Sequence, residues 1–440
     1  MACFFDSTVA RVTVATLCHM IGFPDVIYAP HGEDMVREVF DTGAIALVVS
    51  LLRIHDDDIF LFEKYLDFVK KVAPYHCTAL VQCCAHEIIF IQMQRSLPNK
   101  VLKSSMHALE YMVNNRLHTI TNSSGIPDSL EFFDMHGGMD TVLGYLQPRV
   151  NNDNIDIDAL HLVHAIIYKY PELVPRMCDA GLIPMIFAVL KRENPGLLHK
   201  VVIEDLVSII CQMTENSTHI HLVPKEIAMS FLVMVMKNFQ LLGPTMPLAM
   251  TAICNLTNLH DTTRRAEAPE NLVHYVTNTI GVYEDSLVAQ RAGMRTLLCF
   301  LGSWRNVDKV IVSGGVRWLL LAMTNFGNDL PIAQHCLLAI CIIAQRKDEL
   351  KYMLIPEAEI HDGILVCTLN IMRAHEGELL VQKPAVGLLA MIVVGYPNLY
   401  ADLRNAGGIL ALSQVLELPL VETTTRKIAL KLLKTCSPVL

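Results

Sequence analysis

The stretch Cys178-Asp-Ala-Gly-Leu-Ile-Pro-Met-Ile-Phe-Ala-Val-Leu190 joins a short helix to a longer apolar helix through Gly181. Glycine suits this joint because the chain turns sharply where the two helices meet, and a Cβ would obstruct the turn. Close variants of the stretch recur at residues 41–52, 136–146, 312–321, 361–369 and 405–416. The sequence therefore indicates an array of helical repeats.

The glycines of these variants are regularly spaced. They are Gly43, Gly138, Gly181, Gly315, Gly363 and Gly408. Successive glycines are separated by about 45 residues, or by two or three times that number, which is a repeat length typical of helical solenoids. In a solenoid each repeat packs only on its neighbours, so a chain of 440 residues needs no single large core. The spacing predicts an all-α solenoid of about nine three-helix repeats.

The composition fits a soluble repeat protein. Hydrophobic residues make up 52% of the chain and charged residues 18%, and a buried middle helix in each repeat accounts for the apolar excess. The net charge of −9 argues against nucleic-acid binding, which depends on Lys and Arg. Most of the cysteines lie in apolar helical runs, as expected of buried free thiols in a reducing compartment. With no secretory signal or membrane span recognised, we expect a cytoplasmic or nuclear protein.

We expect residues 1–440 to form a single solenoid, because no linker is long enough to separate domains. Residues 1–32 are predicted to be an N-terminal capping segment, and residues 420–440 a C-terminal capping helix. The second repeat has no glycine joint, and residues 78–94 and 101–115 are predicted as its two long helices. Asp128 and Glu131 have the spacing of a capping box that begins a later helix.

The glycine joint followed by two turns of apolar residues resembles the armadillo repeat. The matching segments are Gly-Ala-Ile-Ala-Leu-Val-Val-Ser-Leu-Leu from Gly43 and Ala-Gly-Leu-Ile-Pro from Ala180, and the resemblance covers nearly the whole chain. It implies a right-handed superhelix whose third helices line a concave groove that binds extended or helical segments of other proteins. The family has many functions, so the resemblance implies no particular partner.

One family feature concerns Asn255. Peptide-binding armadillo proteins place an asparagine on the third helix in an Ala-x-x-Asn-Leu setting, where its amide can both donate to and accept from the ligand backbone. Ala252-Ile-Cys-Asn255-Leu256 matches this setting. The resemblance implies a partner contact at Asn255, and an incidental helix-surface residue is the alternative. Aligned by eye, the other third helices carry no asparagine there (Phe300 is one example), so the sequence does not predict an adaptor for nuclear-import signals.

Two further features are candidates for partner binding. Tyr111 and Tyr168 lie on predicted third helices, and tyrosine is enriched at interaction hot spots; packing between repeats is the alternative role. The last helix carries a basic stripe of Arg426, Lys427, Lys431 and Lys434. This stripe suits an acidic partner, or it provides the polar outer face that a terminal repeat needs.

Patterns that indicate catalysis or metal binding are weak. His161 and His164 have the i, i+3 spacing that can offer two imidazoles to one metal, but the sequence identifies no third ligand. Cys83-Cys84-Ala-His86 lacks the second ligand pair of a zinc site. Glu357 and Glu359 stand two residues apart, so they do not face each other on a helix. We therefore predict no catalytic residue, no cofactor and no metal, and expect that the protein is not an enzyme.

Together these features predict a non-enzymatic protein–protein interaction scaffold that binds partner segments along the groove. A transport or regulatory factor of the same fold, which binds a folded partner such as a small GTPase or a cargo adaptor, is the first alternative. A hydrolase or metalloprotein built from repeats is the second. The sequence predicts partners that are other proteins, with no nucleic acid and no membrane insertion, and it does not predict an oligomeric state.

Overall fold

The computed structural model describes residues 6–21, 43–115, 138–146, 155–192, 199–215, 219–239, 242–258, 268–345 and 363–436. Every regular element within these residues is a helix, and the chain has an all-α solenoid fold. The chain divides into two compact units, Met1–Pro224 and Lys225–Leu440. The prediction of a single solenoid over residues 1–440 stays a prediction.

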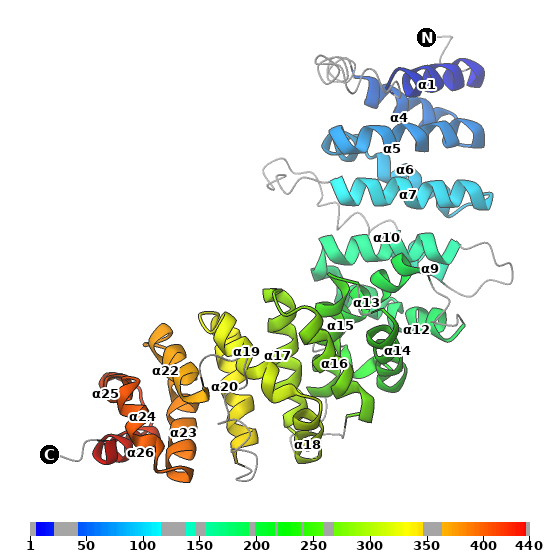
Figure 1. Ribbon diagram of the computed structural model, residues 1–440. Coiled ribbons are helices and arrows are strands. Elements are labelled where there is room, and N and C mark those ends of the chain that lie inside the picture. Colours follow the sequence, from blue (N-terminus) through cyan, green and yellow to red (C-terminus); the bar gives the residue numbers. More distant parts are fainter. Residues whose placement is uncertain are drawn as a thin grey trace. The chain divides into compact units, whose positions relative to one another are not determined.

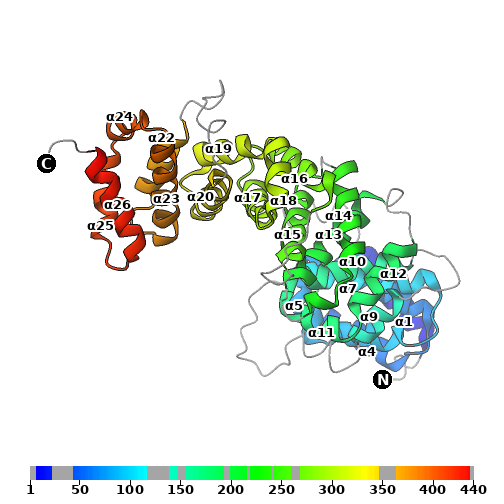
Figure 2. The ribbon, with the colours of Figure 1, turned by 90° about the horizontal axis from the view of Figure 1, so that it is seen from below.

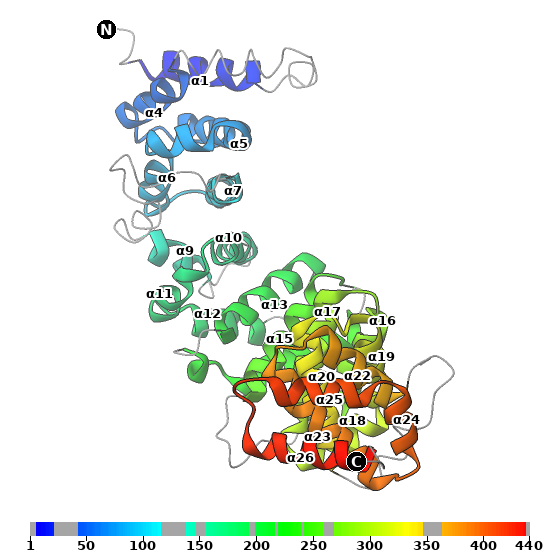
Figure 3. The same ribbon diagram turned by 90° about the vertical axis from the view of Figure 1, so that its left-hand side faces the viewer.

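Long helices stack side by side through the first unit, and we call them ladder helices (Figure 1). They are α1 (Ser7–Ile21), α5 (Ile59–Gln82), α7 (Asn99–Asn115), α10 (Ile155–Lys169) and α13 (Lys200–Glu215). Shorter helices line one side of this stack, as Figure 3 shows for α4, α6 and α9. They are α4 (Ala44–Ile54), α6 (Ala85–Met93), α9 (Gly138–Leu146), α11 (Val174–Asp179) and α12 (Leu182–Arg192), with the 3-10 turns Pro171–Leu173 and Ile220–Leu222.

The second unit repeats this plan. Its ladder helices, of which α17, α20 and α23 follow one another in Figure 2, each pack on the next. They are α15 (Thr245–Asn258), α17 (Leu287–Leu301), α20 (Leu330–Ala344), α23 (Leu379–Gly395) and α26 (Thr423–Cys436). The shorter helices are α14 (Lys225–Asn238), α16 (Glu270–Val282), α18 (Trp304–Val312), α19 (Gly315–Phe326), α22 (Ile364–Ala374), α24 (Leu399–Asn405) and α25 (Gly408–Glu417).

The glycine joints turn the chain by a left-handed backbone conformation. Gly43 has φ 83° and Gly181 has φ 100°, values that side-chain-bearing residues rarely adopt. These two joints confirm the role predicted for glycine. The other aligned positions differ: Gly138 is the first residue of α9, and Gly363 caps α22 with φ −64°.

In the repeats that carry a Gly-Gly pair, the two glycines have different tasks. Gly314 and Gly407 adopt φ 82° and 83°, so the turn lies one residue before the predicted joints. Gly315 and Gly408 begin the following helices and pack closely on the helix before. A Cβ on Gly408 would lie 2.6 Å from the carbonyl oxygen of Leu403, so only glycine fits there without a backbone shift.

Cys84 makes the joint of the second repeat, which lacks a glycine. Its φ is 59°, and among the described residues no other side-chain-bearing residue has a positive φ. The predicted helix over residues 78–94 is therefore wrong. Its first part belongs to α5, which continues past Pro74 with a kink at His76, and its second part is α6. Sequence reasoning joined the two apolar runs because no Gly or Pro marks the break.

Buried glutamines tie two ladder helices of the second unit, α17 and α23, to the helices before them. The side-chain amide of Gln290 donates to the carbonyl oxygens of Ile280 and Tyr283, at 2.9 and 3.0 Å. Gln382 makes the equivalent pair of bonds, both 2.8 Å, to the end of α22. The last carbonyls of a helix lack partners within the helix, so each amide satisfies groups that burial would otherwise leave unpaired.

Both predicted capping segments contain a helix. In the N-terminal one, α1 packs on α5, and the Lys71 ammonium donates to the carbonyl oxygen of Cys18 at 2.8 Å. In the C-terminal one, α26 occupies Thr423–Cys436. The predicted capping box at Asp128 and Glu131 lies outside the described residues, as do Glu357 and Glu359.

Within the described residues, no single helix is long and apolar enough to cross a membrane. One pair, Pro171–Asp179 with Leu182–Leu190, passes by length and composition, although an 86° bend separates its two helices.

Candidate partner-binding surface

The ladder helices pack on their neighbours and on the shorter helices, and most leave one side exposed, although residues 205–211 of α13 and 252–256 of α15 are all buried. We call the exposed sides of α5, α7, α10 and α13 the first ladder face. The exposed sides of α15, α17, α20, α23 and α26 form the second ladder face. These faces correspond to the third-helix surface that the sequence predicts to bind partners.

Histidine–aspartate pairs cross the first ladder face. His107 Nε2 lies 3.0 Å from Asp158 Oδ1. The carboxylate of Asp205, a buried residue of α13, contacts the Nδ1 atoms of both His161 and His164. The sequence identified no carboxylate partner for these two histidines, and the structure corrects this point. Because Asp205 lies on a different helix, no local pattern could have placed it beside them.

These pairs perturb the pKa values of their members. The hydrogen bond to Asp205 raises the pKa of His161, against the effect of burial, and Asp158 acts in the same way on His107. Burial alone would raise the pKa of Asp205, but the hydrogen bonds of the two imidazoles outweigh it and lower that pKa. The first ladder face therefore holds imidazolium–carboxylate pairs when the histidines are protonated.

Both candidate tyrosines are exposed on the first ladder face. Tyr111 is 44% exposed and Tyr168 is 67% exposed, so neither ring is packed away between repeats. The ring of Tyr168 meets that of His164 edge-on, with centroids 6.1 Å apart. A partner would therefore find aromatic area beside the histidine–aspartate pairs. That the two tyrosines contact a partner stays a prediction.

The histidine–aspartate pairs are hydrogen-bonded rather than arranged around an ion. In the part of the chain that the structure describes, no group of three or more His, Cys, Asp or Glu side chains is placed to hold a metal. Cys84, from the ligand-like Cys83-Cys84-Ala-His86 segment, makes a chain turn, and His86 is buried in α6.

Asn255 lies on the second ladder face with half of its amide satisfied. The side chain is only 9% exposed, and its Oδ1 accepts a hydrogen bond from Arg295 Nη2 at 3.1 Å. Its Nδ2 is buried and has no hydrogen-bond partner among the described residues. An unpaired buried donor costs about 1–3 kcal/mol. Phe300, which the sequence alignment placed level with Asn255, is fully buried, and Arg295 lies opposite Asn255 instead.

The ladder helices of the second unit contain no Asp or Glu. Their charged residues are all basic: Arg291, Arg295, Lys383, Arg426, Lys427, Lys431 and Lys434. Among the described residues, the acids that pair with them stand just before a ladder helix: Asp329 contacts Arg291, and Glu422 contacts Lys383. Arg295 and the lysines of the predicted basic stripe make no ion pair with another described residue. The first ladder face differs, because its helices mix acids with bases.

The basic groups of the second ladder face flank an apolar centre. On one side lie Arg291 and Arg295 of α17, and on the other the exposed stripe of α26. Between them, α20 and α23 expose apolar side chains, including Leu338 at 42% and Val394 at 61%, and the exposed Lys383 of α23 is paired with Glu422. Burial, and then the charge of Arg295, lowers the pKa of His335 on α20, which favours its neutral form. The face is thus basic, apolar and basic in succession.

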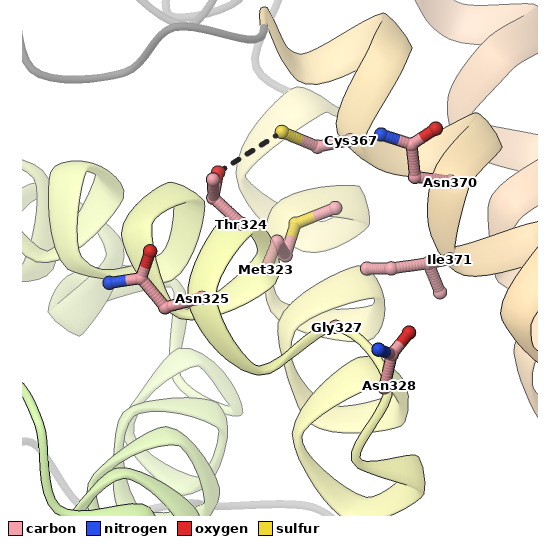
Figure 4. Close-up of a pocket in the computed structure, with 8 residues that line it drawn as sticks. All are labelled: Met323, Thr324, Asn325, Gly327, Asn328, Cys367, Asn370 and Ile371. Atoms are coloured by element: carbon pink, nitrogen blue, oxygen red, sulfur yellow. Dashed lines mark hydrogen bonds between the residues drawn. The ribbon is translucent and has the colours of Figure 1, made fainter.

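A small cleft of about 210 Å³ lies between α19 and α22, away from the ladder helices (Figure 4). Its polar lining includes the side chains of Thr324, Asn325, Asn328 and Asn370. The Thr324 hydroxyl and the Cys367 sulfur are 3.4 Å apart at one edge. The cleft has no charged lining residue, and it gives no indication of a catalytic centre.

Comparison with known proteins identifies the fold. No family model matches the sequence, and no curated protein sequence matches it. A solved structure with this fold is the beta-catenin armadillo-repeat structure, from work on a conserved phosphorylation switch that controls the interaction between cadherin and beta-catenin. The TM-score is 0.71 at 12% sequence identity, over 98% of this chain and 84% of that chain. At this identity the likeness shows the fold alone.

Proposed function

Taking as premise that the chain has the armadillo-type solenoid fold, we propose that it is a non-enzymatic scaffold that binds segments of other proteins along its ladder faces. The observation that carries the proposal is Asn255, whose unpaired amide donor is buried beside the exposed Arg295 side chain. A partner's backbone carbonyl would satisfy this donor when the Arg295 side chain moves aside and uncovers it. The beta-catenin structure supports the proposal, since beta-catenin binds a protein partner, cadherin.

We further propose the chemical class of the partner for the second ladder face. A segment with acidic ends and an apolar centre matches the succession of basic, apolar and basic helices. Adjacent helices pack about 10 Å apart, so α17 and α26, three spacings from each other, are about 30 Å apart. An extended chain rises about 3.3 Å per residue, so about 9 residues bridge these two helices, or about 12 with the acidic residues that flank them. The acidic ends would meet Arg295 at one side and Lys431 at the other.

A peptide-binding experiment tests both statements. The probe is a fluorescein-labelled peptide of about 12 residues with glutamates at both ends and leucines in the centre. The control peptide has the same composition with the glutamates in the centre. Fluorescence anisotropy with the full chain should show that the first peptide binds at least about tenfold more tightly than the second. Added salt should weaken the binding of the first peptide.

Matched variants locate the binding. The double variant Lys431→Glu with Lys434→Glu should bind the acidic-ended peptide at least about tenfold more weakly, because attraction between opposite charges becomes repulsion between like charges. Arg404→Glu, an exposed charge reversal on α24, should leave binding unchanged. Equal affinity for the two peptides would overturn the proposed partner class. Affinity purification that recovers no partner protein with the wild-type chain would count against the scaffold function itself.

A further inference from the structure

Two cysteines on adjacent ladder helices place their sulfur atoms close together. Cys254 of α15 and Cys299 of α17 have an Sγ–Sγ distance of 2.7 Å. Cys254 is fully buried and Cys299 is 8% exposed. A disulfide has an S–S bond of about 2.05 Å. A displacement of less than one ångström therefore separates these sulfurs from the bonded distance.

The surroundings hold the two sulfurs at this place. The Thr296 hydroxyl, also fully buried, donates to the carbonyl oxygen of Met250 at 2.9 Å and so fixes α17 against α15. Asn258 Nδ2 contacts the sulfur of Cys254 at 3.6 Å from the exposed side. These contacts hold α15 against α17 on both sides of the pair, so the two sulfurs stay close together in the folded chain.

We propose that Cys254 and Cys299 are a modification site, a dithiol that a hydroperoxide converts to a disulfide that links α15 to α17. The more exposed Cys299 thiolate attacks the O–O bond, which gives a sulfenic acid and releases an alcohol, or water from hydrogen peroxide. The Cys254 sulfur then attacks the sulfenic sulfur while its proton passes to the departing hydroxyl, which leaves as water as the S–S bond forms. The two thiols lose two protons and two electrons, and the hydroperoxide is reduced.

The order of the two steps follows from the environment of each sulfur. The hydrogen bond shared with Cys299, and then burial, raises the pKa of Cys254. A thiol with a raised pKa is a poor first nucleophile, because the thiolate is the reactive form. Cys254 therefore resolves the sulfenic acid formed on Cys299. The reaction is slow on the folded chain and proceeds when the Cys299 side becomes accessible.

The disulfide would act on the candidate binding surface. Asn255 follows Cys254 in α15, and Arg295 lies one turn before Cys299 in α17. The bond would fix the spacing between the two helices that carry these residues. This inference does not depend on the proposed function, since the bond forms whether or not the face binds a partner.

Intact mass and peptide mapping test the proposal on the full chain. The chain is treated with hydrogen peroxide when folded, and in a second arm it is refolded from urea in the presence of hydrogen peroxide. In at least one arm we expect the mass to fall by two hydrogen atoms, a linked peptide that contains Cys254 and Cys299, and a rise in melting temperature of about 5 °C or more that dithiothreitol reverses.

Variants separate this bond from other oxidation. Cys299→Ser should abolish the linked peptide and the melting shift, whereas Cys341→Ser on α20 should retain both. Absence of the linked peptide in both arms would overturn the proposal. So would a link between other cysteines, or an oxidised form that melts below the reduced one. The linked peptide is detected in the wild-type chain, so the result holds even if a serine variant folds poorly.

Discussion

Replacing Asn255 by leucine tests whether this residue serves partner binding or the stability of the fold. Leucine retains the branched shape of asparagine but removes the unpaired Nδ2 donor and the Oδ1 acceptor of Arg295. Removing the unpaired donor recovers about 1–3 kcal/mol. Losing the bond from the exposed Arg295 side chain costs about 1 kcal/mol. We therefore expect the free energy of unfolding of Asn255→Leu to stay constant or to rise by up to about 2 kcal/mol.

The affinity should change in the opposite direction. A partner carbonyl that faces leucine loses its donor, which costs about 1–3 kcal/mol, or about 5- to 150-fold in the dissociation constant of the acidic-ended peptide. Urea denaturation followed by circular dichroism measures stability, and fluorescence anisotropy measures affinity. Asn405→Leu is the matched control, because Asn405 is exposed at the end of α24 and its replacement should leave the affinity unchanged.

Two results would refute this reasoning. A loss of more than about 1 kcal/mol in the free energy of unfolding would mean that the Asn255 amide stabilises the folded chain. An unchanged affinity for the peptide would mean that the donor does not meet the partner backbone.

The remaining predictions concern charge, backbone and surface. The raised pKa of His161 contributes stability that is complete below about pH 6.5 and is lost as pH rises through its folded pKa, and the lowered pKa of Asp205 contributes stability that is lost in acid. Asp205→Asn should therefore lower the urea midpoint more at about pH 5.5 than at about pH 8.5, and equal losses would contradict the pairing. Urea denaturation of Gly407→Ala should show a free energy of unfolding lower by about 1–2 kcal/mol, because residue 407 has φ 83°. Gly377→Ala should show no such loss, because a Cβ there would lie in open space. The free energy of unfolding of Tyr168→Ala should stay within about 0.5 kcal/mol of the wild-type value, since the side chain is 67% exposed. The variant should recover less partner protein in affinity purification. Unchanged recovery would mean that Tyr168 does not contact the partner.

The repeat architecture was predictable because its signal is local and periodic. Gly43 and Gly181 mark turns that require the left-handed backbone conformation, and the apolar run after each joint marks a buried helix. The failures have local causes as well. Cys84 adopts the left-handed conformation without being glycine, so its turn carries no sequence signal. In the pair Gly407-Gly408 the pattern cannot tell which residue turns the chain.

The candidate site was predictable only in part, because it depends on contacts between repeats. Asn255 could be found from its own helix, but its partner Arg295 could not, since neighbouring helices are offset by an amount that the sequence does not give. The same holds for the contact of Asp205 with His161. The absence of acids from the ladder helices of the second unit is visible in the sequence, but it becomes informative only when those helices are known to share one face.

The paired amide bonds of Gln290 and Gln382 have a consequence for finding related chains. Each occupies the fourth position of its ladder helix and ties down the end of the helix before it, so the requirement is for a carboxamide at a defined place, independent of any glycine. A profile that weights glutamine at this place, together with the apolar run that follows, should detect distant homologues that glycine-centred profiles overlook.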